Sequence, residues 1–490
     1  MDKKYFKHLG FLLITFLLLE AISLFGFKYQ GLGVAFFFII AFLATALSVY
    51  KLEYGLFFVL TELIIGSKGY LFYLSLSEGR LLSLRLVVWS LFMLVFLVRF
   101  ALQLKKFGRQ SQYWRNIKNF SLLKPFLFLA GTVIIGLLTA VIYKNELLNI
   151  FLDFNGWLYF ALLIPLIALK PSRRLLSLAF LAGSIWVSLK TLILLSMFAH
   201  DAAGIGPLAY SWLRKTLVGE MTSAGGWNRV FIQSQIFPAI AYFFLAFRLS
   251  ALKRCKELLQ PLNLSILFVL GLFFATVIIS LSRSFWVGFA AAYGVSLFLL
   301  VIQKEWRRSL KMMAILLASA GLGLLLIFVI SPRGAATQLD DRLAERVSNQ
   351  GEAALASRWA LLPEIFSEIK RNPIIGQGFG ATVTYYSSDP RILAIEPSGR
   401  YTTYAFEWGY LDIWLKLGVL GLAAYFWLFY VLSRAAWRAK REQKDDVYLA
   451  LIAAWTFLIT VHMFTPYLNH PLGIGFIIAS SCLIRTNRVY

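Results

Sequence analysis

Cysteine and histidine are scarce in this chain of 490 residues. It has two cysteines and four histidines, too few for a disulfide framework or for the Cys/His clusters that hold zinc. Cys255 falls in an expected cytoplasmic loop and Cys482 in an apolar run, so we expect no disulfide between them. Charged residues are also few, at 15% of the chain. These shortages exclude a disulfide-rich secreted domain and offer no metal site.

Hydrophobic residues dominate instead. They make up 59% of the chain, and the mean hydropathy is +0.73. Many apolar runs reach the 18 or more residues that a helix needs to cross a bilayer. The sequence therefore predicts an all-α polytopic membrane protein with about fourteen transmembrane helices. The candidate spans lie near 9–27, 31–50, 55–74, 82–101, 124–143, 154–169, 174–198, 229–247, 262–281, 284–302, 312–330, 409–432, 447–465 and 471–485.

The net charge is +24, and the placement of the basic residues indicates the orientation of the spans. The basic residues lie in short clusters between apolar runs, which is the positive-inside pattern of a multi-span membrane protein and no sign of a nucleic-acid partner. With fourteen spans every cluster falls on the side of the N-terminus, so we expect both termini in the cytoplasm. The first run, Leu9 to Phe27, resembles a signal peptide, but Glu20 interrupts it and no small-residue cleavage site follows. We interpret it as an uncleaved span.

One long polar segment, Ser331 to Trp408, interrupts the apolar pattern. It divides the chain into a membrane bundle at 1–330, an extracytoplasmic loop at 331–408 and C-terminal spans at 409–490. Within the loop, a helical run at 354–370 places Leu362, Ile365, Phe366 and Ile369 on one stripe, which fits either a lid on the membrane or packing against the bundle. Asn372-Pro373 should end that helix, and Pro363 should kink it.

Four charged residues lie on the expected outward side. Arg229 opens the eighth span, Arg283 joins the ninth and tenth spans, Arg358 lies in the helical run of the loop, and Glu407 precedes the twelfth span. Charge at membrane depth is expensive, roughly 2.5–3.5 kcal/mol for arginine at a helix centre. A guanidinium fork suits phosphate oxygens, so the arginines, if their helices converge, predict a basic pocket for phosphate groups with the Glu407 carboxylate beside it. The alternative is that each arginine reaches the outer lipid headgroups on its own.

Three motifs resemble the O-antigen ligase and O-antigen polymerase superfamily. The first is Ser280-Leu281-Ser282-Arg283-Ser284-Phe285-Trp286. The second is Ser357-Arg358-Trp359-Ala360-Leu361-Leu362, followed by Asn372-Pro373-Ile374-Ile375-Gly376-Gln377-Gly378-Phe379-Gly380. The third runs from Tyr410-Leu411 through Lys416-Leu417-Gly418-Val419-Leu420-Gly421-Leu422. Together they cover about 280–425 in the expected order around the large outer loop.

The resemblance implies a glycosyltransferase of GT-C-like architecture, without metal or other cofactor, on the outer face of the bacterial inner membrane. Its donor would be a glycan on undecaprenyl diphosphate, and its acceptor a second glycan or a lipid in the bilayer. In the family, outward-facing arginines hold the diphosphate, a role that maps onto Arg283 and onto Arg229. A histidine–asparagine pair usually precedes the span after the loop, but Glu407-Trp408 stands there. Ligase and polymerase activities are thus both open.

The transfer also needs a base for the acceptor hydroxyl. Glu407 is the first candidate, if burial makes its carboxylate basic enough, an effect that nearby arginines oppose. His470 is the second candidate, and His462 lies inside a span. Trp227, Tyr404 and Trp408 could stack on sugar rings, although tryptophan and tyrosine also populate the membrane interface without a ligand. Asp412 and Lys416 are one helical turn apart and should neutralise each other.

Two other function classes fit fourteen spans. A lipid-linked oligosaccharide flippase or other secondary transporter would need charges near the bilayer midplane, where this chain has only Glu62, Lys68 and Lys190. The chain also lacks paired Gly/Pro-broken helices and an internal repeat. A non-catalytic membrane assembly protein is the third class. The concentration of polar residues on one outer face favours the glycosyltransferase.

Overall fold

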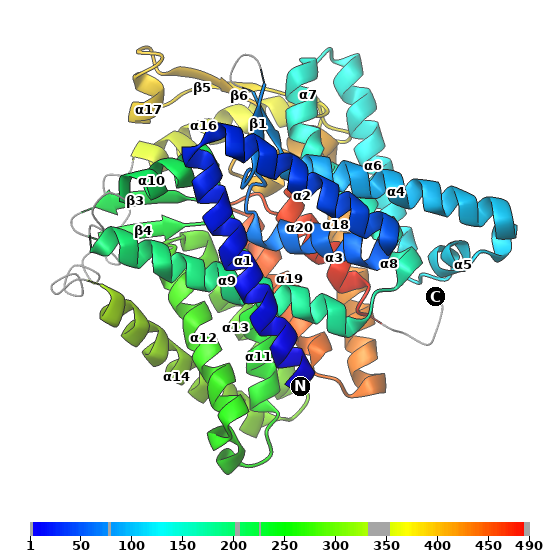
Figure 1. Cartoon of the computed structure of the whole chain (residues 1–490). Helices are drawn as coiled ribbons and strands as arrows, with labels where there is room; N and C mark the ends of the chain where they lie inside the picture. Colours follow the sequence, from blue (N-terminus) through cyan, green and yellow to red (C-terminus); the bar gives the residue numbers. More distant parts are fainter. Residues whose placement is uncertain (1–2, 77–79, 201–205, 225–226, 332–352, 485–490) are drawn as a thin grey trace. The chain divides into compact units, whose positions relative to one another are not determined.

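The computed structural model describes the chain except residues 1–2, 77–79, 201–205, 225–226, 332–352 and 485–490 (Figure 1). The described residues pack as two compact units. The first unit is formed by Met1–Lys118 with Ile164–Leu343, and the second by Asn119–Leu163 with Ala344–Tyr490. In the described part of the chain, three small antiparallel sheets of two strands each accompany the helices: β1 with β2, β3 with β4, and β5 with β6.

Ten helical segments in the described residues are long and apolar enough to cross a membrane. They are Lys4–Lys28, Gln30–Tyr50, Leu84–Gln110, Leu123–Ile142, Leu147–Leu169, Arg173–Ala199, Pro261–Ile279, Arg283–Ile302, Trp306–Ile330 and Gly409–Gln443. Shorter helices occupy the other four predicted spans: Leu52–Ile65, Ile236–Ser250, Val447–His462 and Pro471–Ser481. The chain is a polytopic, all-α membrane protein. The count of fourteen spans stays a prediction.

The first unit contains most of the long helices. Its elements are α1 (Lys3–Lys28), α2 (Gln30–Tyr50), α3 (Leu52–Ile65), β1 (Tyr73–Ser75), β2 (Leu81–Ser83), α4 (Leu84–Phe107), η2 (Gly108–Gln110), α5 (Gln112–Lys118), α8 (Leu163–Leu169), α9 (Arg173–Ala199), α10 (Gly206–Lys215), β3 (Glu220–Ala224), β4 (Trp227–Phe231), η4 (Gln233–Gln235), α11 (Ile236–Ser250), η5 (Cys255–Leu259), α12 (Pro261–Ile279), α13 (Arg283–Ile302) and α14 (Trp306–Ile330).

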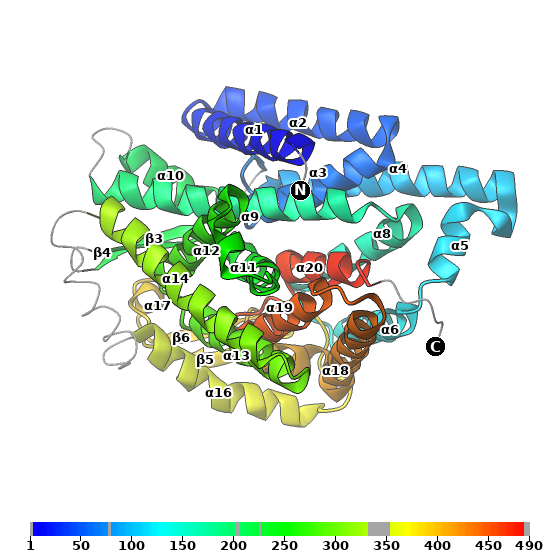
Figure 2. The same cartoon turned by 90° about the horizontal axis from the view of Figure 1, so that it is seen from below.

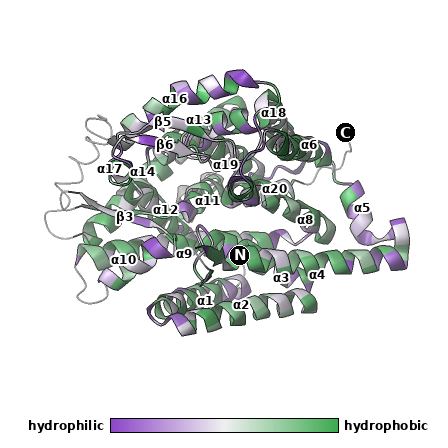
Figure 3. Cartoon of the chain, turned by 90° about the horizontal axis from the view of Figure 1, so that it is seen from above, coloured by the Kyte–Doolittle hydropathy of each residue, from purple (hydrophilic) through white to green (hydrophobic). Residues whose placement is uncertain are grey.

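Helix α9 lies at the centre of the first unit, because it packs against α1, α3, α11 and α12. Helices α1 and α2 lie side by side and cover α3 and α4 (Figure 2), and α12 runs along α14. Hydrophobic residues cover most of α1, α2 and α4, whereas α5 carries hydrophilic ones (Figure 3). This distribution fits helices that face lipid.

Two boundaries in the first unit differ from the prediction. Helix α3 ends at Ile65, well short of 74, and a tight turn follows in which Ser67 and Gly69 have positive φ. The predicted span 229–247 begins as strand, so Arg229 lies in β4 and does not open a helix. Burial alternates from residue to residue here, as it does in a strand. Val230 and Ile232 are fully buried, whereas Arg229 and Phe231 are half-buried.

Charges inside the first unit occur as buried ion pairs. Lys190 of α9 donates to Glu20 Oε1 of α1 at 2.6 Å, and Arg85 of α4 donates from Nε to Glu62 Oε2 of α3 at 2.8 Å. Pairing offsets the desolvation of each charge in the membrane. These residues therefore fasten helices together.

The second unit begins with α6 and ends with three C-terminal helices. Its elements are α6 (Leu123–Ile142), α7 (Leu147–Phe154), η3 (Asn155–Leu162), α16 (Ala353–Arg371), β5 (Val383–Tyr386), α17 (Pro390–Leu393), β6 (Arg400–Thr403), α18 (Gly409–Gln443), α19 (Val447–His462) and α20 (Pro471–Ser481). Helix α18 packs against α6, α19 and α16, and η3 packs against α20. Helix α18 ends at Gln443, eleven residues beyond the predicted end at 432.

The described end of the polar loop folds onto the second unit. Helix α16 matches the predicted helical run; Pro363 lies inside it, and it ends just before Asn372-Pro373. Leu361, Ile365 and Ile369 form its buried stripe and pack with Val383, Phe406 and Leu415. Phe366, which we expected on this stripe, is 42% exposed, because the buried positions repeat every four residues and place it on the neighbouring face. The stripe is explained by packing. The β5–β6 hairpin was not predicted.

Candidate functional site

An arginine-rich turn lies at one end of the first unit. Arg229 of β4 donates a hydrogen bond from Nε to the carbonyl oxygen of Ser280 at 2.8 Å. Ser280 follows the last residue of α12, and Arg283 is the first residue of α13. The structure thus brings Arg229 to the turn that carries Arg283. We call residues 280–284, together with Arg229, the arginine turn.

Aromatic packing and serine side chains hold the arginine turn. The Arg229 guanidinium lies over the Phe231 ring at 5.1 Å, and that ring contacts Phe285 of α13 with 5.9 Å between centroids. The Ser280 hydroxyl accepts a hydrogen bond from the Ser282 amide at 3.2 Å, and the hydroxyls of Ser282 and Ser284 lie 3.0 Å apart.

The backbone of the turn is strained at Leu281, a buried residue with φ of +44°. Side chains other than glycine rarely adopt this region, and such strain concentrates at functional sites. The turn that joins α12 to α13 is only three residues long. Arg283 is the first residue of α13, so the positive end of the α13 dipole lies beside it. A helix N-terminus with an arginine at its first position is suited to an anion.

A second group of predicted site residues lies together in the second unit. Arg358 of α16 forms an ion pair through Nε with Glu407, a residue just before the start of α18. The two side chains are 43% and 53% exposed. Trp408 donates from Nε1 to the Arg358 carbonyl oxygen at 3.1 Å and meets Trp359 edge to face at 5.5 Å. The exposed Arg358–Glu407 pair therefore lies beside the indole rings of Trp408 and Trp359.

The remaining predicted residues lie in different places. His470 is the N-cap of α20, and its Nδ1 accepts a hydrogen bond from the Leu472 amide at 3.3 Å. Its neighbour Tyr467 is buried, which raises the pKa of that hydroxyl well above its usual value. His462 is also buried and accepts from the Leu468 amide at 3.1 Å. Both histidines therefore use one ring nitrogen to hold the α19–α20 connection.

Two predicted sugar-stacking residues receive less support. Tyr404 lies in the short link between β6 and α18 and is half-buried. Trp227 begins β4, but its side chain lies outside the described part of the chain. Their role stays a prediction.

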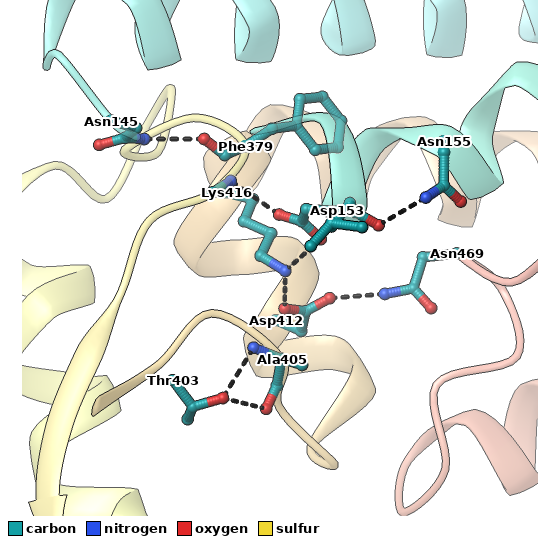
Figure 4. Close-up of polar contacts among 11 residues, drawn as sticks. Asn145, Asp153, Asn155, Phe379, Thr403, Ala405, Asp412, Lys416 and Asn469 are labelled. Carbon is teal, nitrogen blue, oxygen red and sulfur yellow. Dashed lines mark hydrogen bonds and ion pairs between the residues drawn. The ribbon is translucent and has the colours of Figure 1, made fainter. Parts of the chain in front are cut away.

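A buried charge cluster in the second unit was only partly predicted (Figure 4). Lys416 of α18 donates from Nζ to Asp153 Oδ1 at 2.6 Å and approaches Asp412 Oδ1 at 2.5 Å. Asn469 donates to Asp412 Oδ2 at 2.5 Å. The side chains of Lys416, Asp412 and Asp153 are 4%, 3% and 8% exposed. The pairing of Asp412 with Lys416 is confirmed, and Asp153 joins it from α7.

Helix α18 is interrupted at Gly418, whose φ of 67° and ψ of −170° are not helical. Backbone groups on either side of the interruption bond to the segment 373–378 that follows α16. Four hydrogen bonds connect them: from Gln377 N to Leu415 O (2.7 Å), Gly378 N to Lys416 O (3.0 Å), Val419 N to Pro373 O (2.9 Å) and Leu420 N to Ile374 O (3.3 Å). We call this pairing the helix-break joint.

The glycine-rich turn 376–380 belongs to the helix-break joint. Gly376, Gly378 and Gly380 all have positive φ. A Cβ at Gly378 would overlap the backbone of Ala140 in α6, so glycine is required for the close approach. Asn145 fixes the turn from the other side, since its side chain donates to the carbonyls of Gln377 and Phe379 at 3.0 and 2.8 Å (Figure 4).

The predicted site residues thus form two groups, Arg229 with Arg283 in one unit and Arg358 with Glu407 and Trp408 in the other. A single pocket that joins them stays a prediction. Among the residues with described positions, no group of three or more His, Cys, Asp or Glu side chains is arranged to hold a metal ion. Chemistry without a metal also stays a prediction.

Comparison with known protein families gives one match. Residues 267–426 match the family described as O-antigen ligase. The match extends from α12 into α18 and includes Arg283, Arg358, Glu407 and the helix-break joint, whereas Arg229 and His470 lie outside it. No curated protein matches the chain. The family resemblance seen in the sequence motifs is confirmed.

Proposed function

We propose that this chain, which belongs to the O-antigen ligase superfamily through the domain at 267–426, transfers or polymerises oligosaccharides carried on undecaprenyl diphosphate. It is an O-antigen ligase/polymerase-type membrane enzyme. We place its site at the outer face of the bacterial cytoplasmic membrane, with both termini inside, and its product would be O-antigen or exopolysaccharide. The observation that carries the proposal is the arginine turn, because it lies within or against the matched domain and has the chemistry of a diphosphate site.

The reaction needs three groups. The acceptor hydroxyl oxygen attacks the anomeric carbon of the donor, the bond from that carbon to the diphosphate oxygen breaks, and the lipid diphosphate leaves with the electron pair. The hydroxyl proton passes to a base. The protein therefore needs cations at the leaving diphosphate, a base at the acceptor and a surface for the sugars.

Arg283 is the residue that we propose stabilises the leaving diphosphate. Its position at the start of α13 adds the helix dipole to its own charge. Arg229 would contribute from β4, since its Nε is already fixed on the Ser280 carbonyl. A guanidinium presents its N–H donors in a planar fork, so this hydrogen bond fixes the orientation of the Arg229 side chain.

Glu407 is the base that we propose. Its carboxylate is 53% exposed and so is open to an acceptor. Arg358, which we first expected at the diphosphate, pairs with Glu407. This contact supports a role in orienting the Glu407 carboxylate, in addition to any contact of Arg358 with phosphate. His470 is the alternative base, although its Nδ1 caps α20. Trp408 offers a ring for an acceptor sugar.

The transporter alternative receives less support from the charges in the first unit. Lys190 and Glu62, two of the midplane charges that a transporter would use, are each held in a buried ion pair. Charges fixed in this way fasten helices and do not offer a site that opens alternately to each side.

The test is release of undecaprenyl diphosphate by the purified protein, given undecaprenyl-diphosphate-linked glycan and an acceptor glycan. Arg283→Ala should lower the release rate by roughly 10²–10³-fold, the loss typical of removing one charge-stabilising donor. Arg307→Ala is the matched control, because Arg307 is an exposed arginine at the start of α14. It should leave the rate unchanged.

Two outcomes would contradict the proposal. Wild-type protein that binds the lipid-linked glycan without releasing the carrier would exclude the enzyme. Release by Arg283→Ala at the wild-type rate would exclude the arginine turn as the diphosphate site.

A further inference from the structure

The helix-break joint connects the two elements that carry the proposed base and its partner. Helix α16, which holds Arg358, ends at Arg371, and segment 373–378 follows directly. Helix α18, which Glu407 precedes, is the other side of the joint. The four backbone hydrogen bonds of the joint therefore connect the end of α16 to α18.

Side chains tie the last turn of α16 to the same joint. Gln377 donates from Nε2 to the Glu368 carbonyl at 2.6 Å, and Trp414 of α18 donates from Nε1 to the Pro373 carbonyl at 3.0 Å. Asn372 donates to the Gly376 carbonyl at 2.7 Å. The segment cannot slide along α18 without losing these contacts.

Lys416 stands at the centre of this arrangement. Its backbone carbonyl accepts from Gly378 within the joint, while its ammonium group is held by Asp153 and Asp412. Asp153 also accepts a hydrogen bond from the Gly380 amide, through Oδ2 at 2.8 Å. One carboxylate therefore holds both the lysine and the glycine-rich turn.

Lys416 also contacts the residue beside the proposed base. Its Nζ lies over the ring of Phe406 at 5.3 Å from the centroid. Phe406 is buried in the same cluster as Ile365 of α16 and directly precedes Glu407. A contiguous set of contacts thus leads from Asp153 through Lys416 and Phe406 to Glu407.

We propose that Lys416, held by Asp153 and Asp412, is a positioning residue that fixes α16 on the interrupted helix α18 and so sets the place of the Arg358–Glu407 pair. The proposal rests on the proposed function for its catalytic meaning. Its structural part stands on the contacts alone. A buried lysine between two carboxylates can specify one register of the elements around it.

The test variant removes all three charges together: Asp153→Asn, Asp412→Asn and Lys416→Met. Replacing the whole cluster avoids a buried charge without a partner, which would unfold the protein for an unrelated reason. The control is Glu20→Gln with Lys190→Met, a buried membrane ion pair in the first unit. Cys255→Ser and Cys482→Ser provide the background for labelling.

The first measurement is a distance between spin labels at Phe366→Cys on α16 and Tyr430→Cys on α18, two exposed positions, in full-length protein in lipid nanodiscs. Wild type and control should give one narrow distance distribution, and the triple variant a broad or shifted one. A narrow, unshifted distribution in the triple variant would overturn the proposal.

The second measurement is the steady-state rate of carrier release. In the triple variant kcat should fall about 100-fold, the effect of a misplacement of about 1 Å, with KM for the lipid-linked donor unchanged because the arginine turn is intact. An unchanged kcat, or a loss confined to KM, would overturn the catalytic part. If wild type releases no carrier, the proposed function fails, and the spin-label distances alone decide whether Lys416 positions α16.

Discussion

At Gly418 the fold of the second unit should be sensitive to a single added methyl group. Its φ of 67° with ψ of −170° lies in a region that only glycine adopts readily. A Cβ there would also overlap the carbonyl group of Ile374 in the helix-break joint. Gly418→Ala therefore combines backbone strain with a clash against backbone that is itself hydrogen-bonded.

The expected loss of stability follows from these two effects. Strain in this region contributes about 1–3 kcal/mol, and forcing a methyl group into a packed site about 1–3 kcal/mol more. The free energy of unfolding should thus fall by roughly 2–6 kcal/mol. At about 2–4 °C per kcal/mol for a unit of this size, Tm should fall by about 4–24 °C.

Thermal unfolding in detergent, followed by tryptophan fluorescence, measures this shift. Gly131→Ala in α6 is the matched control, because a Cβ there meets nothing within 4 Å and alanine favours a helix. Its Tm should be unchanged or higher. Gly418→Asn should behave like Gly418→Ala, since asparagine tolerates the left-handed helical region and not this one. An unchanged Tm for Gly418→Ala would refute the interruption of α18 at this residue.

Two further predictions concern the base and the topology. Glu407→Gln should lower kcat for carrier release by roughly 10²–10⁴-fold, while the free energy of unfolding changes by about 1 kcal/mol or less because the pair with Arg358 is exposed. Glu396→Gln is the control, because Glu396 is an exposed carboxylate of the same loop. An unchanged kcat in Glu407→Gln would exclude Glu407 as the base. A single cysteine at Phe366 should react with a membrane-impermeant maleimide on intact spheroplasts, and one at Trp306 only after permeabilisation, since both side chains are exposed; the reverse pattern would contradict the predicted orientation.

Hydropathy was sufficient to locate the helices because a bilayer-spanning helix needs a long apolar run and leaves little ambiguity about its type. It was less informative at helix ends. Arg229 and Phe231 lie in a strand, and the short apolar run at 230–232 suits a strand or a helix equally well. Such short runs are decided by tertiary packing, here by the β3–β4 pairing.

Long-range partners of charged residues were beyond the sequence. Asp412 and Lys416 could be paired in advance because they are one helical turn apart. Asp153 could not, since 263 residues separate it from Lys416 and its place at the start of an apolar run is typical of an ordinary interfacial carboxylate. A spare charge in a span is a signal that a partner exists, but the sequence does not name it.

The helix-break joint gives a physical meaning to two of the motifs that carried the family resemblance. Asn372 to Gly380 and Lys416 to Gly421 are each short, and in the sequence they are separated by the β5–β6 hairpin and the start of α18. In the structure they are the two sides of one joint, linked by backbone hydrogen bonds across Gly418. The glycines and the proline serve the backbone geometry of that joint, whereas Arg283 and Glu407 supply charge. Residues required for geometry and residues proposed for chemistry are therefore distinct in this domain, and only the second group should change the reaction without changing stability.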